Sequence, residues 1–216
     1  MRIGLLGGSF NPIHNAHLRI AAEAEKACGL DRVIFIPAAD PPHKPVAGNV
    51  SFENRSFMVD LAIAARPEYE LSTVEGERHG KSYSIDTIRI FRDCFPEDDL
   101  FFIIGADSFL EIGTWHRFAE IFSMCNLVVV HRPGCPILNP LGALPEAVRG
   151  LFTVDSTTGN LSHRSGTTIF FITGSPLELS STEIRRLSAA GDDITRYVSP
   201  EVAAYISHQR IYRQCQ

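Results

Sequence analysis

Residues 3–17 read IGLLGGSFNPIHNAH, and this stretch indicates the class of the fold. It opens with a short apolar run over residues 3–6, which is typical of a buried strand. Gly7 and Gly8 follow, and because glycine has no Cβ, the backbone can approach a ligand closely there. A helix is predicted next, and the N–H groups at its N-terminus form a ready site for an anion. The stretch therefore predicts a strand, a turn and a helix of an α/β fold, with an anion site at the end of the strand.

Similar apolar runs alternate with helical patterns along the rest of the chain. They are short and rich in Ile, Val and Phe, as expected for strands that helices cover on both faces. The predicted strands are residues 3–6, 32–36, 69–73, 100–104, 127–131 and 168–172. This alternation predicts a doubly wound, Rossmann-like parallel sheet with helices on both faces and a C-terminal helical segment. Ligands of such sheets bind beyond the carboxyl ends of the strands.

Capping residues mark several helix ends. Gly29 is placed to end the first helix, and Ser199 and Pro200 to begin the last. A helix is also predicted over residues 51–66, with its apolar residues on one face: Met58, Leu61, Ala62 and Ala65.

Three segments give weaker signals. Residues 133–151 are predicted as a Pro/Gly-rich connection with one short helix, and residues 156–166 as a polar turn. The tail after Tyr205, with Arg210, Arg213 and Cys215, reads as a solvated helix end.

The composition is that of an ordinary globular protein. The 216 residues include 25 acidic and 20 basic side chains, so the formal net charge is −5. The balance of 44% hydrophobic and 21% charged residues argues against intrinsic disorder. The chain has no Lys/Arg block, which argues against binding to duplex nucleic acid. Its length predicts a single domain over residues 1–216.

Membrane and secretory classes are also disfavoured. No run approaches the ~20 apolar residues of a spanning helix, and Gly7 and Gly8 interrupt the first run, which reads as a strand rather than a signal peptide. The five cysteines include no C-x-x-C pair, so neither a disulfide framework nor a cysteine zinc site is expected. These features predict a cytoplasmic protein.

His14 and His17 are the first candidate site residues. Three positions separate them, so both lie on one face of the first turn of the helix, where imidazoles can donate to phosphate oxygens. Two other interpretations remain open. One histidine can be a cap and the other a core residue, or the pair can ligate zinc, although no third ligand is evident nearby.

Two common nucleotide motifs are missing. Gly4, Gly7 and Gly8 do not make the dinucleotide pattern G-x-G-x-x-G. Residues 76–82, GERHGKS, are one residue short of a P-loop and follow a charged stretch, so we predict an exposed loop.

A second anion-ready helix start lies near the C-terminus. Ser180 or Ser181 is a natural N-cap, and Arg185 follows four residues after Ser181 and three after Thr182. Hydroxyls, N–H groups and a guanidinium then converge, which suits a polyphosphate. The alternative is a plain capping segment with a solvated arginine.

These two segments carry a family resemblance. GGSFNPIHNAH (7–17) and LSSTEIR (179–185) resemble two signatures of the nucleotidyltransferase superfamily. Together with DPPHK (40–44), SYSIDT (82–87), GADS (105–108), Trp115 and RPG (132–134), they make nearly the whole chain resemble the bacterial nicotinate mononucleotide adenylyltransferases. The chain departs from the commoner family pattern at Ser9, Asn11, Ala16 and Ser84.

The resemblance implies transfer of AMP from ATP to nicotinate mononucleotide, giving nicotinate adenine dinucleotide and pyrophosphate in NAD biosynthesis. It implies Mg²⁺ as a cofactor, bound mainly through the ATP phosphates, and no metal-ligating residue. The implied partners are ATP and the mononucleotide, without nucleic acid or membrane, and a homo-oligomer stays open.

The resemblance also implies roles for individual residues. The implied catalytic residues are His14, His17, Lys44 and Arg185. The implied ATP-binding residues are Gly7, Gly8, Ser9, Phe10, His14, His17, Gly105, Asp107, Ser180, Ser181, Thr182 and Arg185. The implied mononucleotide-binding residues are Asn11, His43, Lys44, Ser84, Asp107, Trp115, His116 and Arg132.

Other functions stay open at this point. The chain can be another adenylyl- or cytidylyltransferase with a different phosphate acceptor, such as phosphopantetheine, or a nucleotide-binding module without turnover. Trp115, the only tryptophan, can pack in the core or stack on a ring, and the resemblance favours stacking.

Overall fold

The computed structural model describes residues 1–42, 46–47, 50–131, 137–174 and 180–213. The chain forms two compact units, each assembled from three segments. Unit 1 consists of Met1–Leu6, Ile20–Val33 and Tyr83–Leu177, and unit 2 of Gly7–Arg19, Ile34–Ser82 and Glu178–Gln216. This division does not test the single domain predicted over residues 1–216, which stays a prediction. Within the described ranges, no helix is both long and apolar enough to cross a bilayer.

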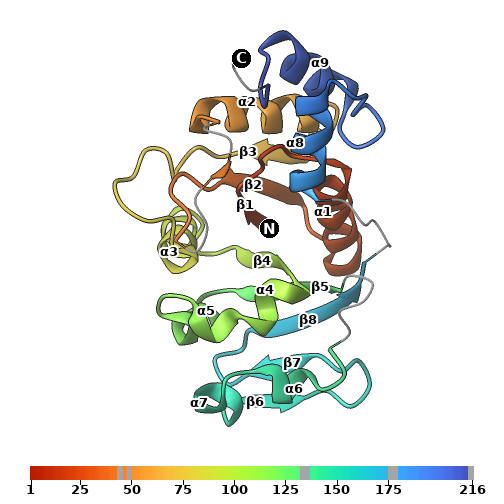
Figure 1. Ribbon diagram of the computed structural model, residues 1–216. Helices are drawn as coiled ribbons and strands as arrows, with labels where there is room; N and C mark the ends of the chain where they lie inside the picture. Colours follow the sequence, from red (N-terminus) through yellow and green to blue (C-terminus); the bar gives the residue numbers. More distant parts are fainter. Residues whose placement is uncertain (43–45, 48–49, 132–136, 175–179, 214–216) are drawn as a thin grey trace. The chain divides into compact units, whose positions relative to one another are not determined.

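Eight strands are hydrogen-bonded neighbours in the order β3-β2-β1-β4-β5-β8-β7-β6. Their bounds are β1 Arg2–Gly8, β2 Arg32–Pro37, β3 Tyr69–Leu71, β4 Asp99–Gly105, β5 Asn126–His131, β6 Phe152–Val154, β7 Leu161–His163 and β8 Thr168–Thr173. In unit 1, β4, β5 and β8 run side by side, with Val128 of β5 paired to Ile103 of β4 and to Phe170 of β8 (Figure 1). The strand order reverses between β1 and β4, which are parallel, with Leu6 opposite Ile103. The predicted α/β class is confirmed, and the reversal is the kind of switch point where such sheets bind ligands.

The sheet is mixed rather than wholly parallel. The hairpin of β6 and β7 adds two antiparallel strands beside β8. The prediction of a polar turn over residues 156–166 is therefore wrong at β7, where Leu161 and His163 are buried and Ser162 between them is exposed. An alternation over three residues is too short to predict a strand from the sequence.

Helices connect these strands. Their bounds are α1 Asn15–Cys28, α2 Phe52–Ile63, α3 Ser84–Cys94, α4 Ala106–Leu110, the short 3₁₀ helix η2 Ile112–Thr114, α5 Phe118–Met124, α6 Pro140–Ala143, α7 Glu146–Arg149, α8 Ser181–Ala190 and α9 Pro200–His208. The single short helix predicted within residues 133–151 is corrected to two, α6 and α7, and residues 132–136 lie outside the described ranges. The predicted stops and caps are confirmed, since Gly29 has φ +59 after α1 and Ser199 Oγ accepts from Val202 N–H at the start of α9.

Helix α2 is shorter than predicted. Its N-cap is Ser51, whose Oγ accepts from Asn54 N–H at 3.2 Å, and it ends at Ile63. Its buried face includes Met58, but Ala65, predicted on the same face, is exposed beyond the helix end. The prediction failed there because the helix stops one turn before Arg66.

Candidate active site

The two signature histidines stack on one another in unit 2. The centroids of the His14 and His17 rings are 3.8 Å apart, with 27° between their planes. The backbone N–H of His14 donates to Nδ1 of His17 at 3.2 Å. Because Nδ1 accepts this bond, the proton of a neutral His17 is assigned to Nε2, which can then donate to a ligand. The predicted proximity of the pair is confirmed, and its role in phosphate binding stays a prediction.

The segment before the histidines is tightly packed. Phe10 is fully buried, and its ring meets the edge of the His17 ring at 5.1 Å between centroids. A Cβ on Gly8 would lie 3.2 Å from the Phe10 ring, so packing within the segment itself favours glycine there. Phe10 has a φ of +44, which a non-glycine residue rarely adopts. Gly7 and Ser9 are exposed. The buried Phe10 ring therefore lies against one side of the His17 ring.

The second signature meets the first within unit 2. Ser181 Oγ donates to the carbonyl oxygen of Pro12 at 3.2 Å, and Nη1 of Arg185 donates to the carbonyl oxygen of Asn11 at 2.8 Å. Nη2 of Arg185 donates to Thr182 Oγ1 at 3.0 Å. The structure thus brings the predicted hydroxyls and guanidinium of α8 beside the histidine segment, although more than 160 residues separate the two.

Helix α8 has a regular capped start. Ser180 is the N-cap, and its Oγ accepts from Glu183 N–H at 3.2 Å. Of the two serines predicted as cap, Ser180 therefore fills the role, and Ser181 is the first helical residue. Binding of a triphosphate by the first-turn N–H groups and the exposed Thr182 hydroxyl stays a prediction.

Asn11 is predicted to bind substrate, but its side chain is 2% exposed and engaged at both ends. Its Nδ2 donates to the Ala47 carbonyl oxygen at 2.7 Å, and its Oδ1 accepts from the Tyr212 hydroxyl at 2.7 Å. A direct contact of Asn11 with substrate stays a prediction. Its two hydrogen bonds connect the histidine segment to Ala47 and Tyr212.

The tail after Tyr205 is not a solvated helix end. Ile211 is buried and Tyr212 is bonded to Asn11. Burial raises the pKa of the Tyr212 phenol, against a lowering effect of Arg185 and Arg55. The prediction failed because two adjacent apolar residues, Ile211 and Tyr212, have no periodicity that would indicate their burial.

Arg55 is a residue of this region that the sequence analysis missed. It lies on the buried face of α2 and is 1% exposed. Its Nη1 donates to the Ser9 carbonyl oxygen at 2.7 Å. Burial lowers the pKa of its guanidinium. A signal was present in the sequence, since Arg55 precedes Met58 by three residues and so shares the apolar face of the predicted helix.

Unit 1 holds a second group of predicted residues. Gly105 is the N-cap of α4, and Asp107 is exposed in the first turn of that helix. Trp115 is half-buried, and its ring is nearly perpendicular to that of Phe102, with 6.3 Å between the ring centroids. Trp115 thus packs on one side, and its stacking on a substrate ring stays a prediction.

Two of the residues predicted to bind the mononucleotide, Ser84 and His116, lie in neighbouring segments of unit 1. The rings of Tyr83 and His116 are 4.4 Å apart with 31° between their planes. Ser84 is the first residue of α3, so its backbone N–H has no partner position within the helix. The Tyr83–His116 contact therefore brings a helix N-terminus beside the segment that follows Trp115.

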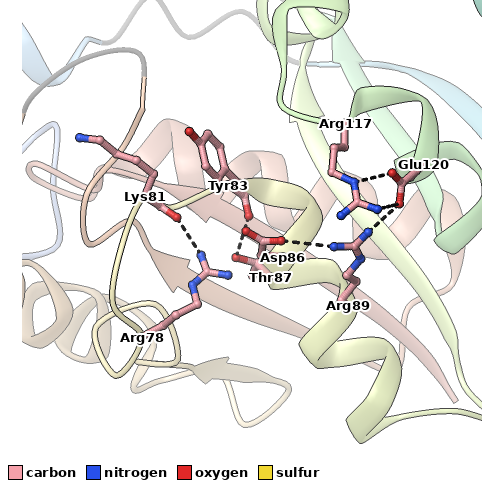
Figure 2. A network of polar contacts seen from close by, with 8 residues as sticks. All are labelled: Arg78, Lys81, Tyr83, Asp86, Thr87, Arg89, Arg117 and Glu120. Atoms are coloured by element: carbon pink, nitrogen blue, oxygen red, sulfur yellow. Dashed lines mark hydrogen bonds and ion pairs between the residues drawn. The ribbon is translucent and has the colours of Figure 1, made fainter.

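Figure 2 shows a polar network that ties these two segments together. Arg89 of α3 donates to Oε2 of Glu120 at 2.6 Å and pairs with Asp86 at 3.5 Å. Arg117 binds the same Glu120 carboxylate through two N–H groups. The guanidinium of Arg117, followed by that of Arg89, lowers the pKa of Glu120. Helix α3 and the start of α5 are thereby cross-linked through the Glu120 carboxylate.

The loop that resembles a P-loop serves another purpose. Ser82 Oγ accepts from the N–H groups of Ala39 and Asp40, both at 3.0 Å, and Lys81 pairs with Asp40 at 2.8 Å. Lys81 is exposed, as predicted, but Ser82 is buried. The loop thus anchors the segment that leads to DPPHK.

Three predicted site residues lie outside the described ranges: His43, Lys44 and Arg132. Their roles stay predictions. Within those ranges, no three His, Cys, Asp or Glu side chains gather into a group that could hold a metal ion.

The chain is similar to known proteins over its full length. The sequence model of the cytidylyltransferase-like family matches residues 5–187. A relative from Pelobacter propionicus, named "Probable nicotinate-nucleotide adenylyltransferase", is 57% identical and the alignment covers 100% of both chains. A relative from Geobacter metallireducens with the same name is 54% identical over 98% of both chains.

Solved structures agree in fold. The nicotinic acid mononucleotide adenylyltransferase of Plasmodium falciparum, complexed with NaAD, matches with a TM-score of 0.75 and 18% identity, covering 98% of this chain and 97% of that one. The same enzyme complexed with APC gives a TM-score of 0.73 at 17% identity, over 98% and 96% of the two chains. At such low identity these matches speak for the fold alone. The family match and the full-length relatives go further: this chain belongs to the cytidylyltransferase-like family and, within it, to the nicotinate-nucleotide adenylyltransferases.

Proposed function

We propose that this chain transfers AMP from ATP to nicotinate mononucleotide, giving nicotinate adenine dinucleotide and pyrophosphate. The observation that carries the proposal is the meeting of the two signature segments in unit 2, where Ser181 and Arg185 of α8 bond to the backbone beside the histidines. Two helix starts, two imidazoles and a guanidinium are a donor set suited to a polyphosphate.

The reaction would be an in-line attack of the acceptor phosphate on the α-phosphorus of ATP. That phosphate is already an anionic nucleophile, so the protein needs no general base. Catalysis then consists of positioning and of stabilising the negative charge that develops on the leaving pyrophosphate. Nε2 of His17 and the guanidinium of Arg185 would donate to phosphate oxygens, and Lys44 would add a further positive charge.

The acceptor would be recognised by residues of unit 1. The N-terminus of α3 at Ser84 favours an anion over a neutral group, so the carboxylate of nicotinate would be preferred to the amide of nicotinamide. Trp115 would stack on the pyridine ring, and Asp107 would accept hydrogen bonds from ribose hydroxyls.

Mg²⁺ would accompany the ATP. The described side chains beside the histidines are imidazole, guanidinium and hydroxyl groups, which do not form the carboxylate set of a protein-held magnesium site. We therefore propose that the ion is bound mainly through phosphate oxygens and water. When bound, it would neutralise part of the phosphate charge.

The described cysteines support a cytoplasmic setting for this activity. Among the described cysteines, Cys28, Cys94 and Cys125 are unpaired thiols. Thiols of this kind are typical of a reducing compartment.

A pyrophosphate-release assay tests the proposal. ATP and Mg²⁺ are supplied with nicotinate mononucleotide, nicotinamide mononucleotide or phosphopantetheine, and release is measured for each acceptor. We expect release with nicotinate mononucleotide to exceed the other two by at least about tenfold, the ratio that a 1.4 kcal/mol difference in transition-state binding produces. Equal or faster release with phosphopantetheine would assign a different acceptor. ATP binding without release for any acceptor would assign a nucleotide-binding module.

A further inference from the structure

Arg55 is a buried cation without an ion-pair partner among the described residues. It is 1% exposed, it takes part in none of the ion pairs found in those ranges, and its Nε is buried with no hydrogen-bond partner. Its guanidinium also lies over the Phe52 ring, 5.6 Å from the centroid. Burial without a close ion pair disfavours the charged guanidinium, and the more distant Glu53 and Glu75 carboxylates offset this only in part, because the pKa of Arg55 is lowered.

Among the described residues, the Arg55 side chain makes one hydrogen bond, and it leads to the signature segment. Its Nη1 holds the Ser9 carbonyl oxygen at 2.7 Å. That carbonyl belongs to the peptide between Ser9 and Phe10, so Arg55 fixes the plane from which the φ of Phe10 is measured. At +44 this φ lies in the left-handed region, which a phenylalanine occupies only where its surroundings enforce it.

The Phe10 ring in turn packs against His17. The edge-on contact of 5.1 Å sets one side of the His17 ring, and the bond from His14 N–H to Nδ1 sets its rotation. The carbonyls of Asn11 and Pro12 are held by α8. The Ser9 carbonyl accepts from Arg55 of α2 instead, so Arg55 is the side chain that orients the peptide before Phe10.

We propose that Arg55 is a positioning residue, which enforces the strained backbone at Phe10 and thereby holds the His17 imidazole in place for the phosphates of ATP. The inference rests on the proposed function for the identity of the ligand. It goes beyond that function by assigning a task to an arginine that does not itself contact substrate.

The test compares R55M, R55K and wild type, with R66M as a matched control from the exposed end of the α2 region. Methionine matches much of the arginine volume and removes the buried charge. We expect R55M to keep or exceed the wild-type Tm and to lose about 10- to 100-fold in kcat, because a small displacement of a catalytic group costs rate rather than stability. R55K retains a donor for the Ser9 carbonyl and should recover part of the kcat. R66M should keep the wild-type kcat.

A second readout does not depend on turnover. The ¹⁵N resonances of the His17 ring, assigned with His17→Gln, report which nitrogen carries the proton. We expect wild type to show an acceptor Nδ1 and R55M to show a mixture of tautomers. Lack of turnover in wild type would contradict the proposed function. The His17 ring resonances of wild type and R55M would still show whether Arg55 positions the imidazole.

Three results would overturn the inference. One is a folded R55M with the wild-type kcat, KM and His17 resonances. Another is a loss of activity in R55M that only follows a lowered Tm, which would make Arg55 a packing residue. The third is an R55K as impaired as R55M, because the donor to Ser9 would then not matter.

Discussion

The guanidinium of Arg185 donates to the carbonyl oxygen of Asn11 at 2.8 Å, across 174 residues of sequence. The same group donates to Thr182 Oγ1, so two of its five N–H donors are engaged by the protein itself. A long side chain that is fixed in this way loses less conformational freedom when it binds an anion. The arginine is therefore preorganised by the segment that carries the histidines.

Replacing Arg185 by lysine should weaken both the hydrogen bond to the Asn11 carbonyl oxygen and the binding of phosphate. Lysine lacks the planar fork that can reach a carbonyl and a hydroxyl at once. We expect kcat/KM for ATP to fall by about 10- to 100-fold, the scale for one or two lost charge-assisted hydrogen bonds. Steady-state pyrophosphate release at varied ATP concentration measures this kcat/KM. Arg186→Lys is the matched control, because that exposed neighbour pairs with Glu183 instead.

Removing the His17 ring tests the donor directly. We expect His17→Ala to lower kcat by roughly 10²–10³, the scale for losing one preorganised donor to developing charge. Its Tm should change little, since His17 is only partly buried. His208→Ala, on the exposed last turn of α9, should turn over like wild type. A correctly folded His17→Ala with normal turnover would remove the histidine from the mechanism.

Trp115 is predicted to serve the acceptor. We expect Trp115→Ala to raise KM for nicotinate mononucleotide by about tenfold and KM for ATP by less than about twofold, since aromatic stacking contributes 0.5–1.5 kcal/mol. Because Trp115 also packs against Phe102, the Tm should fall as well. Trp115→Phe keeps a stacking ring and should restore most of the affinity. Equal increases in both KM values would show that the indole only packs.

The sequence predicted those parts of the site whose residues are close together in the chain. The helical spacing of His14 and His17 and the Ser180 cap are local properties, and the structure has both. Arg55 and Tyr212 were missed because their partners, Ser9 and Asn11, are supplied by folding from distant segments. The spacing of Arg55 and Met58 places this arginine on the apolar face of the predicted helix, but no local pattern identifies the remote carbonyl that it binds.

The same distinction holds for the strands. Strands β1, β4 and β5 were predicted from their uninterrupted apolar runs, because a strand covered on both faces is apolar throughout. The short hairpin of β6 and β7 was not, since its strands contain three residues each and are fixed by pairing with β8. Which helix face is buried at Arg55 likewise depends on what packs there.

The ion-pair network around Glu120 should affect KM for the mononucleotide and leave KM for ATP unchanged. Glu120→Gln removes the charge that binds both Arg89 and Arg117, so α3 and the start of α5 lose their ionic cross-link. We expect KM for the mononucleotide to rise about two- to fivefold, the scale of one exposed ion-pair network of up to about 1 kcal/mol. Glu68→Gln, which breaks the exposed pair with Arg66, should leave both KM values unchanged. A change of KM for ATP alone would contradict this role.

His163 should make the stability of the protein depend on pH. It is buried against Phe122 and Phe152, its Nε2 has no hydrogen-bond partner, and burial, followed by the charge of Arg164, lowers its pKa below the usual 6.5. The unfolded chain therefore binds a proton at a higher pH than the folded one. The contribution of His163 to the free energy of unfolding is fully present above about pH 6.5. It is lost as the pH decreases from the unfolded-state pKa to the folded-state pKa, by about 1.4 kcal/mol for each pH unit between these two pKa values.

The measurement is Tm at about pH 7.5 and pH 5.5, on either side of the ordinary histidine pKa, for wild type and His163→Asn. Asparagine can accept the Ser165 N–H bond that Nδ1 accepts, but it does not titrate. We expect the variant to be less stable at the higher pH, because it leaves part of the ring space unfilled, and to lose less Tm on acidification than wild type. If both proteins lose the same Tm, other groups account for the pH dependence. A larger loss in the variant would reverse the sign that burial of a neutral imidazole requires.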